Sequence, residues 1–281
     1  MSFIQGVDMS NIKKINTVTV DVHAATLLTE IDFTALAPAD WTGESTVSLD
    51  GKAWDIQNGG NANAFGPDGS TLVLHPKGTA VGDWYNTNRS TPSIAIDLSD
   101  LDSSLTDSCR YAVQIITPGF QSPGGNYARL LFGFYNPAST NKGYGPVFGL
   151  YHNGGNDAIY WIQGSNDEAA DSSVGFTGSE QTFWVYLESN GLWTTYTSDS
   201  QDTTVDGGTK VGTVWASISS PSQIGRGADL TTHAGTDYLT TGLLTKPSTS
   251  RVVLTSVGYN ATTTGPTMNI DSLRVWKLSN D

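Results

Sequence analysis

Few residue combinations in this chain could catalyse a reaction. Glycoside hydrolysis with retention, for example, needs two carboxyl groups held close together, one acting as acid and base and the other as the nucleophile. The glutamates are Glu30, Glu44, Glu168, Glu180 and Glu188. The nearest approach to a paired arrangement is Glu30-Ile31-Asp32, and the aspartates are scattered in turn-like stretches. We therefore predict no catalytic residues and a non-enzymatic protein.

Metal chemistry has equally little support in the sequence. His23, His75, His152 and His233 are far apart, and no HExxH or CxxC spacing occurs. We expect no cofactor. A calcium site is the alternative, because hard cations prefer oxygen ligands; its candidate ligands are Asn153, Asn156, Asp157 and the Asn166–Glu168 group. Turn chemistry explains the same residues without a metal.

A binding surface is the remaining possibility, because the chain is rich in aromatic residues. Rings provide flat apolar faces, and neighbouring amides and carboxylates provide hydrogen bonds. The candidate glycan-binding residues are Trp84, Tyr85, Tyr144, Tyr151, Trp161 and Trp184. Each ring taken singly is also compatible with a place in the core.

The stretch 181–200 shows how such rings would be positioned. Phe183, Val185 and Leu187 alternate with larger or polar residues, a two-residue period that predicts a half-buried strand. Asn190-Gly191 suits a tight hairpin turn, so a second strand is predicted to return beside the first. If the Phe183 set faces the core, Trp184 lies on the opposite face, where either a ligand or another part of the chain would cover it.

Three earlier segments have the same strand character. They are Tyr127–Tyr135, Pro146–His152 and Ala158–Ile162. We expect them in the same sheet as the hairpin. Asp50-Gly51 between two short apolar runs predicts another hairpin, and Cys109 is interpreted as a small buried residue and not as a nucleophile.

Composition limits the partners and the compartment. The chain has 281 residues and a net charge of −13, so a nucleic-acid partner is not expected. A single cysteine rules out an intramolecular disulfide. We find no signal peptide, so we expect synthesis in a cytoplasm. No apolar run is long enough to span a membrane, so membrane insertion is not expected.

Several segments resemble those of concanavalin A-like (laminin G/glucanase) β-sandwiches. The matching parts are the Glu30–Phe33 opening followed by Ala39-Asp40-Trp41, the 181–200 hairpin, and the closing Ile270–Trp276 run. The resemblance spans Glu30 to Leu278. It implies an all-β fold, a two-sheet antiparallel β-sandwich (jelly roll) over residues 29–281, with Glu30–Phe33 beside Met268–Trp276. The ExDxE run that carries catalysis in laminarinase-type members is absent here.

The N-terminal segment resembles another group of proteins. Ser10, Ile12, Lys13, Ile15, Asn16 and Val18 match the short segments that open many bacteriophage tail, fibre and minor virion proteins, with Thr17 in place of the usual glycine. The resemblance implies that residues 1–28 form an extended arm that attaches to other virion proteins. A first strand of the sandwich or a tail is the alternative.

These resemblances together imply a structural component of a bacteriophage particle, located in the virion after synthesis in the host cytoplasm. A tail fibre, a spike, or a capsid or tail decoration subunit would each fit, as a homo-oligomer whose sandwich binds protein or a host-surface glycan. A carbohydrate-binding module or lectin outside a virus is the alternative, and a glycan-cleaving enzyme is the third possibility.

Overall fold

The structure is a computed structural model of the chain. It describes residues 25–57, 65–75, 77–78, 92–121, 127–135, 147–153, 156–163, 167–171, 181–187, 193–198, 213–218, 232–233, 236–237, 247–259 and 267–278. The arm expected over residues 1–28 lies almost entirely outside this range. Among the described residues, no helix is long and apolar enough to cross a membrane.

Short strands make up nearly all of the described chain. The strands are β1 (Thr26–Asp32), β2 (Thr46–Leu49), β3 (Lys52–Gln57), β4 (Gly66–Pro67), β5 (Leu72–Leu74), β6 (Lys77–Gly78), β7 (Ser93–Asp97), β8 (Arg110–Thr117), β9 (Gly119–Gln121), β10 (Tyr127–Tyr135), β11 (Val147–Asn153), β12 (Asn156–Gln163), β13 (Asp167–Asp171), β14 (Gln181–Leu187), β15 (Trp193–Ser198), β16 (Thr213–Ile218), β17 (Thr232–His233), β18 (Thr236–Asp237), β19 (Arg251–Tyr259), β20 (Thr267–Ile270) and β21 (Ser272–Leu278). The helical elements are η1 (Phe33–Ala35), α2 (Leu98–Leu101) and η6 (Pro247–Thr249).

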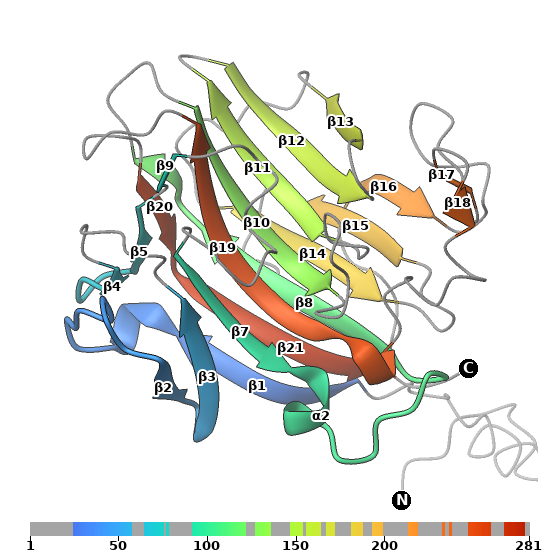
Figure 1. Cartoon of the computed structure of the whole chain (residues 1–281), viewed down its shortest axis with the longest axis horizontal. Helices are drawn as coiled ribbons and strands as arrows, with labels where there is room; N and C mark the ends of the chain where they lie inside the picture. The colour runs from blue at the N-terminus through green and yellow to red at the C-terminus, as the bar shows by residue number, and fades with distance from the viewer. Residues whose placement is uncertain are drawn as a thin grey trace, which may run out of the picture.

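Two large sheets lie face to face and form a sandwich (Figure 1). One is six-stranded, in the order β1-β21-β8-β14-β15-β16. The other is nine-stranded, in the order β13-β12-β11-β10-β19-β7-β3-β2, with β6 beside β19. A smaller sheet, β4-β5-β20-β9, continues from β8 and β21 at one end, and β17 pairs with β18. The predicted fold class, an all-β two-sheet antiparallel sandwich, is confirmed.

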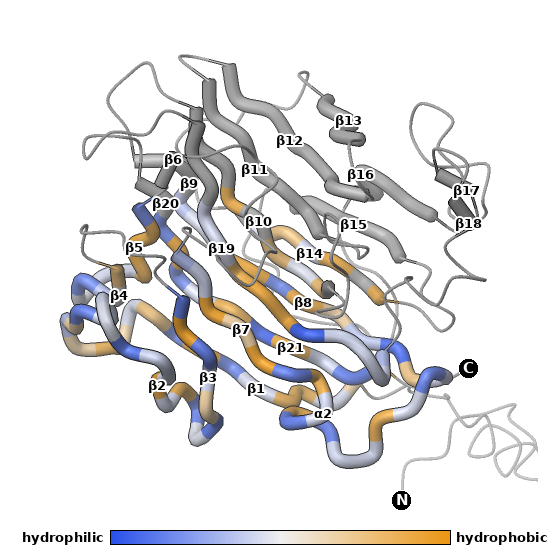
Figure 2. Tube along the Cα trace, viewed as in Figure 1, coloured by the Kyte–Doolittle hydropathy of each residue, from blue (hydrophilic) through white to orange (hydrophobic). Residues whose placement is uncertain are grey.

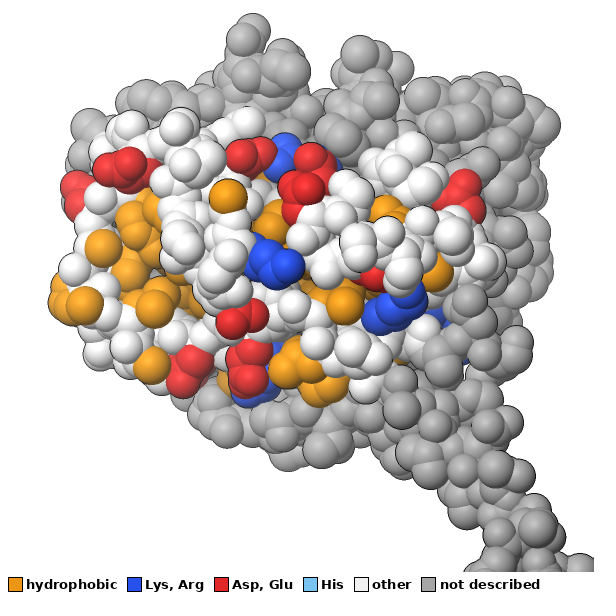
Figure 3. Space-filling model, turned by 90° about the horizontal axis from the view of Figure 1, so that it is seen from below, with side chains coloured by type: hydrophobic (Ala, Val, Ile, Leu, Met, Phe, Trp, Pro, Cys, Tyr) orange, Lys and Arg blue, Asp and Glu red, His pale blue; other side chains and the backbone are white. Residues whose placement is uncertain are grey.

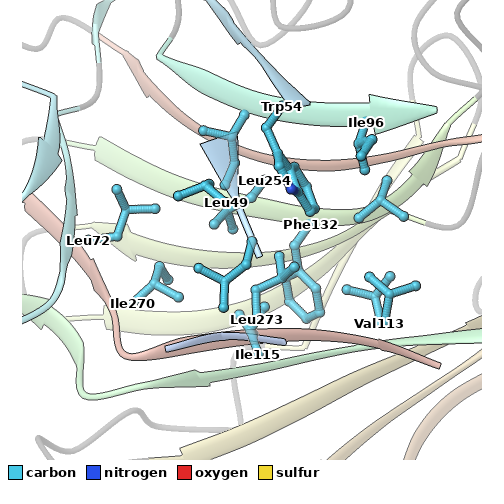
Figure 4. Packing of buried hydrophobic residues seen from close by; sticks show 14 of the residues in the cluster. Leu49, Trp54, Leu72, Ile96, Val113, Ile115, Phe132, Leu254, Ile270 and Leu273 are labelled. Carbon is cyan, nitrogen blue, oxygen red and sulfur yellow. The ribbon is translucent and has the colours of Figure 1, made fainter. Parts of the chain in front are cut away.

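Side chains from both sheets interlock in the space between them. Trp54 and Phe132 project from the nine-stranded sheet towards Ile115 and Leu273 of the six-stranded sheet (Figure 4), and each is buried. Hydrophobic residues occur along β7 and β19 (Figure 2), because both strands lie in the middle of the nine-stranded sheet. Burial of this apolar surface is the main source of the sandwich's stability.

The two predicted hairpins are present. Residues of β14 and β15 pair in register from Thr182 with Ser198 to Leu187 with Trp193. The turn between β2 and β3 places Asp50 at φ 51° and Gly51 at φ 69°. Positive φ at both central residues is what a two-residue hairpin turn requires, and Asp-Gly supplies it at little cost.

The first and last described strands pair as predicted. Glu30 stands opposite Arg274 and Ile31 opposite Leu273 in the antiparallel β1–β21 ladder. Arg274 Nε donates a hydrogen bond of 2.7 Å to Glu30 Oε1 across this pair. β1 starts at Thr26, so the strand extends upstream of the boundary expected at residues 28 and 29.

The expected grouping of the middle strands is wrong. β10, β11 and β12 belong to the nine-stranded sheet, whereas the β14–β15 hairpin belongs to the six-stranded one. β13 pairs with β12 and is the edge strand of the nine-stranded sheet. The next strand of the chain, β14, joins the other layer. Two-residue alternation identifies the faces of a strand but carries no information on its neighbours.

Asp50 connects the edges of the two layers. Its Oδ2 accepts hydrogen bonds from Thr29 Oγ1 at 2.9 Å and from the Glu30 backbone N–H at 3.1 Å. Asp50 lies in the turn at the edge of the nine-stranded sheet, whereas Thr29 and Glu30 lie in the edge strand of the six-stranded sheet. The positive φ of this hairpin turn therefore places a carboxylate against a strand of the opposite layer.

A buried carboxylate, Asp102, fixes the segment that follows α2. Its Oδ2 accepts a 2.7 Å hydrogen bond from the Tyr111 hydroxyl and lies 2.7 Å from Lys277 Nζ. Its Oδ1 accepts bonds from the backbone and side chain of Ser104 at 2.9 and 2.6 Å. Burial alone raises the pKa of Asp102, but the bonds from Lys277, Ser104 and Tyr111 outweigh burial and hold the pKa well below its ordinary value.

This network predicts a pH-dependent contribution to stability. A depressed pKa means that the stabilisation by Asp102 is fully present above the ordinary carboxyl pKa of 3.8 and is lost as the pH falls towards the folded-state value. Replacing Asp102→Asn should lower the free energy of unfolding at neutral pH by about 1.5–3 kcal/mol, as for hydrogen bonds to charged groups.

Urea denaturation at a series of pH values measures this effect. The difference between the parent protein and the Asp102→Asn variant should shrink as the pH falls below about 4. Asp107→Asn removes an exposed charge outside the network but keeps an oxygen that can accept the bond from the Ser248 N–H, so it should change stability by less than about 0.5 kcal/mol. A difference between parent and Asp102→Asn that stays constant into acid would contradict the assignment.

Candidate functional site

The structure separates the candidate glycan-binding rings. Trp84, Tyr85 and Tyr144 lie outside the described residues. Tyr151 and Trp161 lie in β11 and β12 of the nine-stranded sheet, and Trp184 lies in β14 of the six-stranded sheet. The attachment residues proposed between Ser10 and Val18 also lie outside the described range, so their role stays a prediction.

Register places Tyr151 and Trp161 on two neighbouring strands, β11 and β12. Trp161 is in register with Phe148, which in turn pairs with the buried core residue Phe132. Tyr151 pairs with Ala158, three residues before Trp161. The glycan-binding roles of Tyr151 and Trp161 stay predictions.

Trp184 lies on the outer face of the six-stranded sheet, as alternation predicts, but the ring is fully buried. It belongs to a small hydrophobic cluster with Ala112 and Leu278, against which Trp276 packs. Of the two possibilities left open by the sequence, the structure therefore shows a covered ring. A buried indole presents no face to a ligand, so Trp184 is structural in this arrangement.

Truncating Trp184 therefore tests packing. Replacing Trp184→Ala should lower the free energy of unfolding by about 3–5 kcal/mol, because it empties a buried aromatic site. Trp184→Phe should cost less, since most of the ring remains. Leu27→Ala removes a side chain that is 39% exposed and is the matched surface control. Chemical denaturation measures all three, and a Trp184→Ala loss as small as the control's would show that the ring is not covered.

The described residues form a surface pocket at the end of the sandwich where β4 and β5 lie. It has a volume of about 490 Å³, within the range of small-molecule sites. Its lining residues are Pro38, Ala39, Asp40, Gly66, Pro67, Asp68, Val73 and His75. At this end of the molecule, hydrophobic side chains gather on the surface with acidic ones beside them (left side of Figure 3).

Backbone pairing fixes the two walls of the pocket relative to each other. The Ala39 N–H donates to Pro67 O at 3.0 Å, and the Trp41 N–H donates to Phe65 O at 2.7 Å. Gly66 lies between these contacts at φ 150°, and a Cβ there would approach Ala39 O to 2.2 Å. Only glycine permits so close an approach of the two segments.

Local hydrogen bonds orient both carboxylates of the pocket. Asp68 Oδ1 accepts from the Ser70 and Thr71 N–H groups at 2.7 and 2.8 Å. Asp40 Oδ1 accepts from the Thr42 N–H at 2.8 Å. Hydrogen bonds from the Thr42 side chain and backbone lower the pKa of Asp40, so this group is ionised at neutral pH.

His75 contributes an imidazole to the same pocket. The side chain is half-buried, and burial lowers its pKa below the ordinary value of 6.5. The ring is therefore neutral at neutral pH, with one nitrogen able to donate and the other able to accept. Together with the two carboxylates it makes a pocket that can hydrogen-bond hydroxyl and amine groups.

The candidate calcium ligands lie in β11, β12 and β13, except Asn166, which lies outside the described residues. Asn153 pairs with Asn156 at the β11–β12 connection, and Glu168 of β13 pairs with Ile162 of β12. Among the residues that the structure describes, no group of three or more histidine, cysteine, aspartate or glutamate side chains is placed to hold a metal ion.

The sequence contained weak signals of this pocket. Asp68-Gly69 belongs to one of the turn-like stretches in which the aspartates occur, and Asp40 belongs to the Ala39-Asp40-Trp41 part of the sandwich resemblance. Both aspartates form local hydrogen bonds typical of turns, so nothing in their spacing indicates that β4 pairing brings them to one cavity. His75 follows a buried strand and has no distinguishing neighbours in the sequence.

The class defined by this architecture is a two-sheet antiparallel β-sandwich with a pocket at one end of the sandwich. No family model matches the sequence, and no curated protein matches it. Several solved structures are similar in fold. One is the CBM2 module of the evolved Dit of Lactobacillus casei BL23 phage J-1, with a TM-score of 0.48, 10% identity, and coverage of 92% of this chain and 97% of that chain.

Two further similar structures come from other sources. The exoplasmic/lumenal domain of VIP36, in its metal-free form, has a TM-score of 0.42 and 10% identity over 90% of this chain and 93% of that chain. A lectin from Bauhinia forficata, in complex with GalNAc, has a TM-score of 0.40 and 13% identity over 91% of this chain and 100% of that chain. The fold of this chain is established by its own strand order and register.

Proposed function

We propose that this protein is a non-enzymatic structural component of a bacteriophage particle whose sandwich binds a glycan on the host surface. The observation that carries the binding part is the pocket at β4 and β5. There two oriented carboxylates and a neutral imidazole border an apolar wall of Pro38, Pro67 and Val73. Concave sites with an apolar lining and a few fixed polar groups are typical of small-ligand recognition.

The charge state of Asp40 does not suit the general-acid role in glycan cleavage. A glycosidase needs one carboxyl that stays protonated near neutral pH to act as the general acid, which requires a raised pKa. Hydrogen bonding lowers the pKa of Asp40 instead. An ionised carboxylate held by its own loop is a hydrogen-bond acceptor, and sugar hydroxyls are suitable donors for it.

The virion part of the proposal rests on the N-terminal segment. Its Ser10, Ile12, Lys13, Ile15, Asn16 and Val18 pattern resembles segments of phage tail and fibre proteins. An extended segment can add a strand to a partner's exposed sheet edge. A tail fibre, spike or decoration subunit assembled as a homo-oligomer fits this reading. A lectin outside a virus remains the competing function, and it would share the pocket but not the attachment.

Filling the pocket tests glycan binding. Val73 is half-buried on β5 and lines the cavity, so Val73→Phe places a ring in the space that a ligand would occupy. We expect its binding to a glycan array, and to host cells, to fall by at least about tenfold, equivalent to about 1.4 kcal/mol.

The matched control for that experiment is Ala53→Phe. Ala53 is an exposed position of β3 that does not line the pocket, so the same ring is added away from the site. Near-ultraviolet circular dichroism should show both variants folded. Retained binding by a folded Val73→Phe protein would contradict the pocket's role, and a parent protein that binds no glycan would contradict the glycan function.

Deleting residues 1–24 tests attachment. The deletion ends before β1, whose pairing with β21 is kept, so we expect a folded protein with unchanged melting temperature. Co-purification with phage particles should be lost, because the proposed attachment residues are removed. Full incorporation of the shortened protein would show that the segment is not needed for assembly, and a protein that fails to fold would show that the segment belongs to the sandwich.

A further inference from the structure

We infer that the pocket at β4 and β5 selects a sugar that carries a protonated amine over the neutral or carboxylated sugar of the same stereochemistry. The inference rests on the proposed glycan-binding function and adds the charge of the ligand. It follows from the cavity, its apolar wall and the charges of its described lining.

Two aspartates, Asp40 and Asp68, line this cavity, and hydrogen bonds hold the segments that carry them. Asp68 belongs to the turn between β4 and β5, where two backbone N–H groups hold its Oδ1. Asp40 follows Ala39, whose N–H donates to Pro67 O, so its segment is bonded to β4. Fixed acceptors lose little conformational freedom when they bind a donor. The hydrogen bond they form is strongest when the donor is charged.

No positive side chain balances these carboxylates among the described residues of the lining. His75 is the titratable partner there, and its burial favours the neutral ring. Three other cations, Arg251, Arg274 and Lys277, form ion pairs elsewhere, with Asp55 and Asp97, with Glu30 and with Asp102 respectively. The described lining contains Asp40 and Asp68 and neither lysine nor arginine, so it carries net negative charge at neutral pH.

The charge of the whole chain acts in the same direction. A net charge of −13 gives the surface a field that repels anions and attracts cations. Sugars with carboxylate groups meet both this field and the two pocket carboxylates. An ammonium group on the sugar meets attraction from both.

The apolar part of the lining favours a sugar over a bare cation. Pro38, Pro67 and Val73 form a wall that can contact the C–H face of a pyranose ring. An ammonium ion without such a ring would use the carboxylates alone, and exposed ion pairs contribute only about 0.2–1 kcal/mol. The ring contact and the charge contact together define the ligand class.

Three sugars that differ only at one position provide the test. They are the methyl glycosides of 6-amino-6-deoxyglucose, glucose and glucuronic acid, and the corresponding galactose series repeats it with the other C4 stereochemistry. Binding to the full-length protein is measured at neutral pH by NMR titration or calorimetry. We expect the amino sugar to bind best and the uronic acid worst, and added salt to reduce the difference.

Variants then locate the effect. Asp68→Asn removes the charge but keeps an oxygen that can accept the bonds from the Ser70 and Thr71 N–H groups. It should weaken binding of the amino sugar by about twofold to fivefold, equivalent to up to about 1 kcal/mol. It should leave the neutral sugar nearly unchanged. Asp107→Asn removes a charge at another part of the surface and should change neither affinity.

Each contrary result has a definite meaning. Equal affinity for the amino and neutral sugars, or equal weakening of both by Asp68→Asn, overturns the charge selection but leaves glycan binding in place. Lysine amide binding as tightly as the amino sugar overturns the sugar class in favour of a basic peptide. Loss of glycan binding in the array experiment is the separate result that would overturn the proposed function itself.

Discussion

The pairing of β1 with β21 is the contact on which the rest of the fold depends. It joins the two ends of the described chain within one sheet, so the intervening strands form a closed sandwich between them. β21 also pairs with β8, which places the closing strand between the first strand and the middle of the sheet. Contacts so distant in sequence are entropically costly to form, and the packed core of the sandwich compensates for that cost.

The same pair of strands also positions the pocket. β8 and β21 each bend near Pro118 and Asp271 and continue as β9 and β20, where β5 and then β4 add to the edge. The Asp271 N–H donates to Ile116 O at 2.8 Å, and its carbonyl accepts from the Phe33 N–H at 2.9 Å, so the bend is bonded on both sides. The small sheet is thereby a rigid extension of the large one. The segments that carry Asp40 and Asp68 are bonded to this extension through the Ala39–Pro67 and Asp68–Thr71 backbone contacts.

Local chemistry predicts the individual strands and turns of this protein, but it does not predict which strands pair with one another. Alternation at Phe183, Val185 and Leu187 identified the buried face of β14, and Asp50-Gly51 identified the turn between β2 and β3, because both are properties of adjacent residues. The sheet to which β11 belongs, and the burial of Trp184, depend on long-range pairing. The pocket depends on it too, since Asp40 and Asp68 meet through the bond between Ala39 and Pro67.

The hydrogen bond between Asp50 and the Glu30 N–H has a consequence for solubility. β1 is an edge strand, and edge strands present backbone donors and acceptors that can pair with strands of other molecules. Asp50 occupies one such donor with a carboxylate from the opposite layer. A foreign strand approaching there would have to displace that bond and face an uncompensated negative charge. The hairpin turn therefore disfavours aggregation through this edge of the sandwich.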